Sequence, residues 1–299
     1  MKKELIKVGF LVSYDWYLLK NALPLVYPAS DVIYLALDRK RLTWAGNPFN
    51  FDEKAFYEML EKVDTARKIK IYEDDFFVEG LNPMQCEVRE RNLLAQEMGE
   101  GGWHIQLDAD EYFLKFREFT DFLQNKPISQ KEINICVAWI NLFKKTEKGF
   151  FHTINQELDL IQIASNKPFY EYGRKNGYFN YIAPFFILHD TWARGEEEVW
   201  QKISNWGHKN DFDTEQYFLF WKSINEENYQ EIKNFHPINP PAWKALGFVE
   251  GQSIEDVISK FSVKDFPLNK FQLFLKNNRN IARLKHLFTK TFRLNATEN

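Results

Sequence analysis

Four short apolar segments in the first third of the chain alternate with stretches of helical character, and this alternation most constrains the fold. The strand-like segments are KVGFLV (7–12), DVIYLAL (31–37), KIKIY (68–72) and WHIQL (103–107). Strands that are joined by helical crossovers pair in parallel and form a doubly wound sheet. The sequence therefore predicts an α/β fold with a mostly parallel, Rossmann-like sheet flanked by helices.

The helix expected over residues 83–98 has the clearest boundaries. Asn82 precedes it as the N-terminal cap, Pro83 stands in its first turn, and three glycines between 99 and 102 follow its end. Such residues are typical of helix starts and stops. The helix therefore leads directly into the strand predicted at 103–107.

The pattern of the chain changes near residue 190. Residues 133–189 are rich in strand-like segments, whereas helix-like stretches begin near 196 and are expected again after a proline-rich connector at 236–243. We therefore predict a first domain over 1–190, a helical C-terminal extension over 191–263 and a basic amphipathic tail over 264–299.

The charge distribution argues against general nucleic-acid binding. The net charge is −3, and the tail over 264–299 carries eight Lys or Arg against two acids, so residues 1–263 carry −9. A nucleic-acid-binding surface is expected to be basic. In the tail, apolar and basic residues alternate over 266–294, which favours either packing against the rest of the chain or peripheral contact with an anionic membrane surface.

Cysteine content and hydropathy predict a cytoplasmic protein. The basic tail adds peripheral contact with the inner face of the membrane as an alternative location. Cys86 and Cys136 are the two cysteines, too few for a disulfide scaffold, so a reducing compartment is expected. No segment reaches the roughly 20 apolar residues of a membrane-spanning helix. We therefore do not expect the chain to be an integral membrane protein.

Carboxylates follow three of the predicted strands, where ligands bind in open α/β sheets. Ser13 and Asp15 follow the first strand, Asp38 follows the second, and Asp108 and Asp110 follow the fourth. Because Asp108 and Asp110 are two residues apart in an extended segment, their side chains project to the same side, about 6.5–7 Å apart. Such a pair suits Mg²⁺ or Mn²⁺, which can neutralise a leaving nucleoside diphosphate.

These features resemble the nucleotide-sugar-dependent glycosyltransferases of the GT-A fold, especially those similar to glycosyltransferase family 2. The resemblance rests on the two early strands with their acids, on ERNLLAQEMG (90–99) and on WHIQLDADEY (103–112), and it covers residues 5–115. It implies that the domain over 1–190 is a GT-A catalytic domain. It also implies a nucleoside diphosphate sugar donor and Mn²⁺ or Mg²⁺ as cofactor.

The resemblance implies donor-binding roles for several residues. Ser13, Asp15 and Asp38 would contact the nucleoside, and Arg91 would lie near the donor phosphates. Basic residues at 39–41 follow Asp38, where the families have acidic and hydroxyl residues. The identity of the nucleoside therefore stays open.

The resemblance also implies a metal site. Asp108 and Asp110 would hold the metal together with the ribose or diphosphate of the donor. His189 is the last residue of the strand-like segment YIAPFFILH (181–189). In many GT-A enzymes a late histidine at the end of a strand completes the metal shell, so the resemblance implies this role for His189. A structural histidine in the core is the alternative at this position.

An inverting sugar transfer needs a carboxylate that takes the proton of the acceptor hydroxyl. Glu157, Asp159, Glu171 and Asp190 lie in the half of the domain expected to bind the acceptor. We favour Glu157, although none of the four stands in a motif and each can be an ordinary solvated acid.

The sequence thus predicts a metal-dependent glycosyltransferase that acts on a carbohydrate or lipid-linked acceptor, as in the synthesis of a bacterial surface polysaccharide or glycoconjugate. The first alternative is a nucleotidyltransferase, but SYDWYLLKN (13–21) lacks the glycine-rich, basic loop that holds a triphosphate. The second alternative is a non-catalytic nucleotide- or carbohydrate-binding module, which the intact carboxylate pair disfavours.

Overall fold

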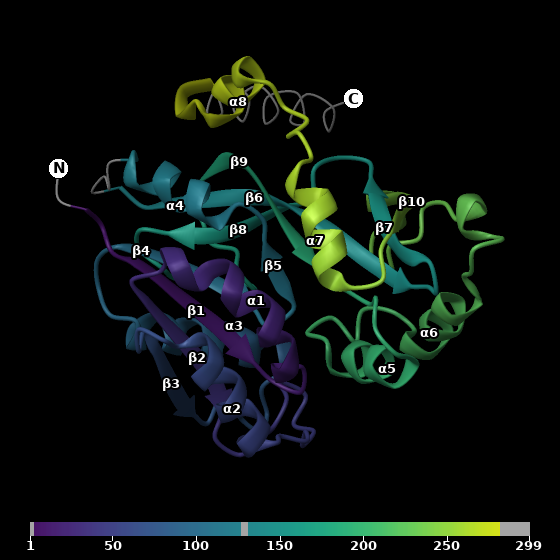
Figure 1. Ribbon diagram of the computed structural model, residues 1–299, viewed down its shortest axis with the longest axis horizontal. Helices are drawn as coiled ribbons and strands as arrows, with labels where there is room; N and C mark the ends of the chain where they lie inside the picture. Colours follow the sequence, from purple (N-terminus) through teal and green to yellow (C-terminus); the bar gives the residue numbers. More distant parts are fainter. Residues whose placement is uncertain (1–2, 127–130, 282–299) are drawn as a thin grey trace, which may run out of the picture.

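The parallel half of the sheet forms where the alternating segments predict it (Figure 1). A computed structural model describes residues 3–126 and 131–281 of the 299-residue chain. Its first strands are β1 (Ile6–Val12), β2 (Val32–Asp38), β3 (Ile69–Asp74) and β4 (Trp103–Asp108). They pair in parallel in the order β3-β2-β1-β4. The predicted α/β fold is confirmed.

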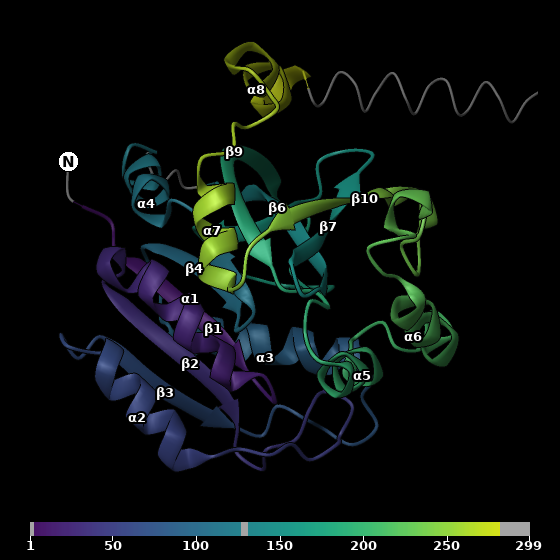
Figure 2. The ribbon, with the colours of Figure 1, turned by 45° about the vertical axis from the view of Figure 1, so that its right-hand side comes forward.

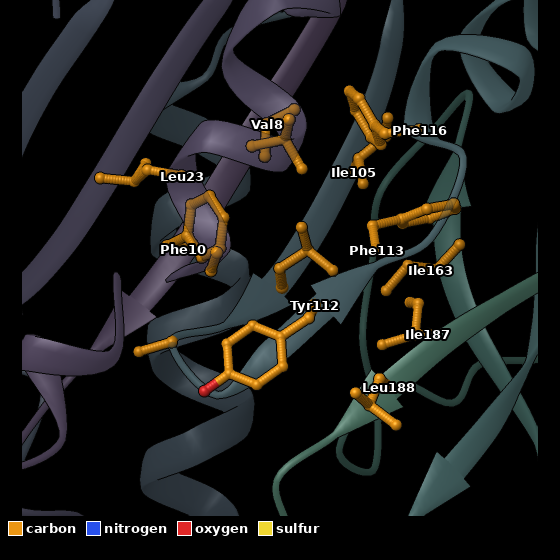
Figure 3. Packing of buried hydrophobic residues seen from close by; sticks show 14 of the residues in the cluster. Val8, Phe10, Leu23, Ile105, Tyr112, Phe113, Phe116, Ile163, Ile187 and Leu188 are labelled. Carbon is orange, nitrogen blue, oxygen red and sulfur yellow. The ribbon is translucent and has the colours of Figure 1, made fainter. Parts of the chain in front are cut away.

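Helices cover both faces of this parallel half. They are α1 (Leu19–Val26), α2 (Glu53–Val63) and α3 (Pro83–Glu97). Alternate residues of a strand point to opposite faces of the sheet. On one face Val8 and Phe10 pack with Leu23 of α1 (Figure 3). On the other, a Cβ atom on Gly9 would lie 2.8 Å from Leu94 of α3, so β1 is buried on both sides, as its mostly apolar sequence predicts.

The second half of the sheet has mixed pairing. Its strands are β5 (Glu111–Phe113), β6 (Ile133–Lys145), β7 (Gly149–Asn155), β8 (Leu160–Ser165), β9 (Phe179–His189) and β10 (Trp243–Glu250). Within the described ranges the strands form a single ten-stranded sheet, in which β8 joins β4 to β6 by antiparallel pairing. β9 pairs in parallel with β6 and antiparallel with β5. The expectation of a strand-rich segment over 133–189 is confirmed.

The short strand β5 connects the parallel half to β9. Tyr112 and Phe113 stand opposite Leu188 and Ile187 of β9, and all four side chains lie in the main hydrophobic core (Figure 3). Burial of each such side chain contributes about 1.5–3 kcal/mol. Because β5 directly follows the Asp108–Asp110 turn, this packing determines where that turn sits relative to the end of β9.

The segment 191–263 is not helical throughout, which corrects the prediction for it. It contains α5 (Glu196–Asn205), α6 (Thr214–Ser223) and α7 (Ile254–Ser262), but also strand β10. β10 pairs antiparallel with β7, and its residues Trp243 and Leu246 are buried in an aromatic cluster with Trp192 and Trp221. The partner strand is remote in sequence, so the local pattern did not indicate this pairing. The domain boundary near 190 stays a prediction.

Part of the predicted amphipathic tail forms α8 (Lys270–Asn277), which lies beyond β9 at the edge of the molecule (Figure 2). The Asn277 amide bonds to the backbone of Ile182 at 2.7 and 2.9 Å. Phe271 and Phe274 are 68% and 60% exposed. The rest of the tail, 282–299, lies outside the described residues. No helix in 3–126 or 131–281 is long and apolar enough to span a membrane.

A buried lysine joins β1 to the C-terminal end of α3. The helix has the predicted start, because Asn82 and Gln85 form a capping box. At its other end, the Lys7 ammonium donates to the carbonyl oxygens of Met98, Gly99 and Glu100, each at 2.8 Å. These carbonyls lie at the end of the helix, where intrahelical partners are lacking. A cation there also interacts favourably with the negative end of the helix dipole. Lys7 therefore orients α3, which carries Arg91 to the ligand-binding end of the sheet.

We expect Lys7→Met to lower the free energy of unfolding by about 2–3 kcal/mol, because it removes charge-assisted hydrogen bonds and leaves the buried carbonyl of Met98 unpaired. Urea denaturation of this variant, with the exposed Lys20→Met on α1 as matched control, measures the loss. Equal stabilities of the two variants would contradict the capping role.

Candidate active site

A cavity of about 630 Å³ opens at the carboxyl ends of β1, β2 and β4. Its walls come from both halves of the sheet and from α3 and α5. The predicted site residues in its lining are Ser13, Asp15, Asp38, Arg91, Asp108, Asp110 and His189. The fold therefore brings together all of the predicted donor-binding and metal-binding residues, although they lie far apart in the sequence.

Asp108 ends β4, and its carboxylate is shared by two buried arginines. Arg91 Nη2 lies 2.9 Å from Asp108 Oδ1, and Arg174 Nη2 lies 3.0 Å from the same oxygen. Burial opposes ionisation of Asp108, but Arg174 and Arg91 outweigh it and lower the pKa of this carboxyl. The Asp108 side chain keeps 31% exposure, so this paired group still faces the cavity.

Arg174 forms a second, fully buried pair with Glu111 of β5. Its two terminal nitrogens donate to the two Glu111 carboxylate oxygens at 3.0 and 2.7 Å, and Trp139 Nε1 donates to Glu111 Oε1 at 3.0 Å. Glu111 Oε2 also accepts from the backbone N–H of Asp108 at 2.9 Å. The sequence had given no role to Glu111 or Arg174. Together they hold Asp108 by its main chain and by its side chain.

The Asp110 carboxylate is buried, with 3% exposure, and it also receives two cations. Arg194 Nη2 and Lys202 Nζ both donate to Asp110 Oδ2. Both cations donate in addition to the carbonyl oxygen of Asp190, at 3.0 and 3.1 Å. Burial alone would raise the pKa of Asp110, but the neighbouring charges, Lys202 first, lower it instead. Asp110 is therefore an ionised anchor for Arg194 and Lys202.

His189 lies next to Asp110, as the sequence predicted. The pairing of Glu111 with His189 places His189 Nε2 at 3.8 Å from Asp110 Oδ2. Its Nδ1 lies 3.0 Å from Asn141 Oδ1, and its ring stacks on Trp139 with 4.8 Å between centroids. Burial lowers the pKa of His189 to about 3, so the imidazole is neutral at physiological pH.

The predicted metal set does not fit a divalent ion as these side chains stand. Mg²⁺ and Mn²⁺ require open oxygen ligands, whereas each carboxylate of the Asp108–Asp110 pair already contacts two basic side chains. A divalent ion placed among these fixed cations would be repelled by them. No group of three or more His, Cys, Asp or Glu side chains in the described part of the chain has a metal-binding arrangement.

The two early aspartates occupy different environments. Asp15 Oδ2 accepts from Arg194 Nη1 at 3.2 Å, and burial raises the pKa of Asp15 despite that cation. Asp38 accepts four backbone N–H groups, from residues 40 and 42 at Oδ1 and from residues 76 and 77 at Oδ2. Four acceptor sites are the capacity of a carboxylate. Asp38 therefore shapes the wall of the cavity and has no free acceptor for a nucleoside.

The four candidate bases are not equivalent. Glu157 is exposed in the turn between β7 and β8, and Glu171 is exposed between β8 and β9. Neither belongs to the cavity lining, and Asp190 does not either. Asp159 lines the cavity, receives a hydrogen bond from Asn141 Nδ2 at 2.9 Å, and has a pKa raised by burial. The geometry thus favours Asp159 over Glu157.

Three basic residues of the site were missed or given no role in the sequence. Arg174 lies in the irregular stretch between β8 and β9, Arg194 precedes α5, and Lys202 projects from α5. The sequence offered a signal for Arg194, because this residue ends the segment PFFILHDTWAR (184–194), which also contains the predicted site residue His189. Arg174 and Lys202 had none, since isolated basic residues are usually solvated.

Comparisons with known proteins do not assign a family. No protein-family model matches the chain, and no curated protein matches its sequence. Among solved structures, the chain is similar to GalNAc-T7 with UDP, GalNAc and Mn²⁺, at 11% identity and a TM-score of 0.37 over 75% of this chain. It spans about half of that protein, 52%.

Two further solved structures show a similar level of likeness. S. aureus TarS 1–349 has 12% identity and a TM-score of 0.37 over 77% of this chain and 75% of that one. 4-Diphosphocytidyl-2C-methyl-D-erythritol synthase has 12% identity and a TM-score of 0.33 over 56% of this chain and 75% of that one. These likenesses assign no function to the site.

One acid in the cavity wall makes stability depend on pH. Glu90 of α3 is 5% exposed and accepts a hydrogen bond from Trp44 Nε1. Burial raises the pKa of Glu90 to about 8, against the opposing effect of Trp44. The Glu90 carboxyl therefore keeps its proton in the folded state up to about pH 8. In the unfolded state it loses this proton above the ordinary glutamate pKa of about 4.3. The Glu90 contribution to stability falls as pH rises from about 4.3 to 8.

We expect Glu90→Gln to leave stability at pH 4 nearly unchanged and to increase it at pH 8 by on the order of 4 kcal/mol, because Gln cannot ionise. Urea denaturation across this pH range measures the difference. Glu97→Gln, at an exposed position of the same helix, is the matched control. A pH profile of Glu90→Gln that runs parallel to that of the unmodified chain would refute the buried, protonated Glu90.

Proposed function

We propose that the chain transfers a sugar from a nucleoside diphosphate sugar to an acceptor hydroxyl. The observation that carries this proposal is the Asp108–Asp110 pair, held at the carboxyl end of β4 by four basic side chains and facing a cavity of about 630 Å³. Carboxylates suit the hydroxyls of a ribose or sugar, and clustered cations suit a diphosphate.

The donor phosphates would bind on the side of the site formed by α3 and α5. Arg91, Arg174 and Lys202 all line the cavity. The Nη1 atom of Arg91 is buried and has no hydrogen-bond partner among the described residues. A buried guanidinium nitrogen without an acceptor is costly, and a phosphate oxygen would satisfy it. The nucleoside would lie toward Ser13 and Asp15, at the end of β1.

The acceptor would bind on the side formed by β6, β8 and the C-terminal segment. Trp139, Trp206 and Trp243 line the cavity there, and the half-buried Trp206 would be the ring available to a sugar. Asp159 lies in the same wall. Whether the acceptor is a free carbohydrate or a lipid-linked one, and whether the chain acts in the cytoplasm or at a membrane surface, stay predictions of the sequence.

In the proposed transfer, Asp159 takes the proton of the acceptor hydroxyl. The hydroxyl oxygen of the acceptor attacks the anomeric carbon of the donor at the same time. The bond from that carbon to the donor phosphate breaks, and the nucleoside diphosphate leaves with the bonding electrons. The cations around Asp108 and Asp110 would stabilise the charge that develops on the leaving oxygen. A nucleotidyltransferase reaction is less well supported, because the loop after β1 has no glycine or basic residue in residues 13–19.

A panel of nucleoside diphosphate sugars tests the proposed donor class directly. We expect the nucleoside diphosphate sugars of one base to raise the melting temperature of the chain. A ligand at a hundredfold excess over its Kd stabilises the folded state by about 2.7 kcal/mol. The matching nucleoside triphosphate is the comparison for a nucleotidyltransferase. Stabilisation by the triphosphate alone would reject the proposed function.

We expect Asp159→Asn to reduce kcat for sugar transfer about 10²–10⁴-fold, because the amide cannot accept the acceptor proton. In the unmodified chain, kcat should rise with pH through the raised pKa of Asp159 and then level off, as the ionised form is the base. Glu157→Gln separates the two candidate bases. A large loss in Glu157→Gln with none in Asp159→Asn would restore the base first favoured from the sequence.

A further inference from the structure

The basic side chains on Asp110 have different relations to the cavity. The Arg194 side chain is 3% exposed, contacts Asp15 and Asp110, and does not belong to the cavity lining. The Lys202 side chain is 12% exposed and does line the cavity. Arg194 therefore holds Asp110 from behind, and Lys202 is the cation on the ligand side.

Lys202 is held in this position by a well-anchored helix. The first turn of α5 has Glu198 reaching back to the backbone N–H of Gly195 at 2.9 Å, and Tyr17 donates to the same carboxylate. Val199 and Ile203 of α5 are fully buried in the aromatic cluster. At the far end, Asn205 accepts from Thr43 at 2.8 Å. The Lys202 ammonium is thus presented by a rigid element, as a preorganised cation requires.

We propose that Lys202, backed by Arg194, supplies at the donor diphosphate the positive charge that a divalent ion would otherwise supply, so that donor binding needs no metal. This inference rests on the proposed function. An ammonium has three donors, and Lys202 Nζ uses two of them, on Asp110 and on the Asp190 carbonyl. The third has no acceptor among the residues that the structure describes, and a phosphate oxygen in the cavity that Lys202 lines would supply one. Arg91 and Arg174, which pair with the neighbouring Asp108, line the same cavity.

Calorimetry of the full chain, stripped of metal with a chelator, tests this proposal with two probes. Inorganic pyrophosphate reports the anion site without regard to base or sugar, and a panel of UDP, GDP, ADP and CDP reports the donor site. We expect pyrophosphate and one nucleoside diphosphate to bind without metal, and excess Mn²⁺ to change both affinities less than threefold.

Substitutions at Lys202 assign the effect to this side chain. We expect Lys202→Met to weaken metal-free binding of both probes tenfold or more, and Lys202→Arg, which keeps the charge, to weaken it much less. Lys222→Met is the matched control, because Lys222 pairs with Glu196 outside the cavity. Thermal unfolding of each variant verifies that it is folded, and Lys202→Gln, which also removes the charge, repeats the test if Lys202→Met unfolds.

The outcomes separate this proposal from the proposed function. Binding of both probes only with Mn²⁺ would overturn the metal-free site and leave sugar transfer standing. Metal-free binding of pyrophosphate with no binding of any nucleoside diphosphate would support the cationic site and reject the donor class. Failure of both probes with and without Mn²⁺ would overturn both proposals, and unchanged metal-free binding in Lys202→Met would remove Lys202 from the site.

Discussion

The antiparallel pairing of β5 with β9 is the interaction on which the candidate site depends. It sets Glu111 opposite His189, and one step further the backbone N–H of Asp190 donates to the carbonyl of Asp110 at 3.0 Å. This register brings the segment that contains Arg194 and Lys202 onto the Asp108–Asp110 turn. A shift by one residue would point every side chain of β5 to the other face. The buried aromatic residues of β5 make such a shift costly, so hydrophobic packing maintains the geometry of the charged site.

The charges of the site are buried, and burial makes their pairing obligatory. An isolated carboxylate in such surroundings would lose several kcal/mol of hydration, and one cation rarely restores it. Here each carboxylate of the pair contacts two basic groups, and Arg174 joins Asp108 to Glu111. The result is a network whose members cannot move independently. A rigid set of cations loses little entropy when an anion binds, which is the property that a donor diphosphate site needs.

The cavity has two chemically different walls, and the topology explains the difference. The parallel half contributes the carboxyl ends of β1, β2 and β4, which carry acids and the arginine of α3. The mixed half contributes Trp139 and Asp159, and the segment after β9 adds further tryptophans. In the proposed transfer, the charged wall would take the donor diphosphate and the aromatic wall the acceptor sugar. The aromatic wall is itself anchored, since Trp243 of β10 belongs to the C-terminal aromatic cluster.

The sequence by itself determined the parallel half and the acidic ends of its strands, because both follow from local patterns. Apolar runs of strand length and the caps of α3 are local, and Asp108 and Asp110 were readable from their spacing. What only the tertiary structure decided depends on contacts between remote segments. Arg174 and Lys202 are isolated basic residues until β9 and α5 carry them to the carboxylates, and β10 is a strand only because β7 offers its edge. Asp38 illustrates the same limit, since its four backbone donors come from two loops that meet only in the folded chain.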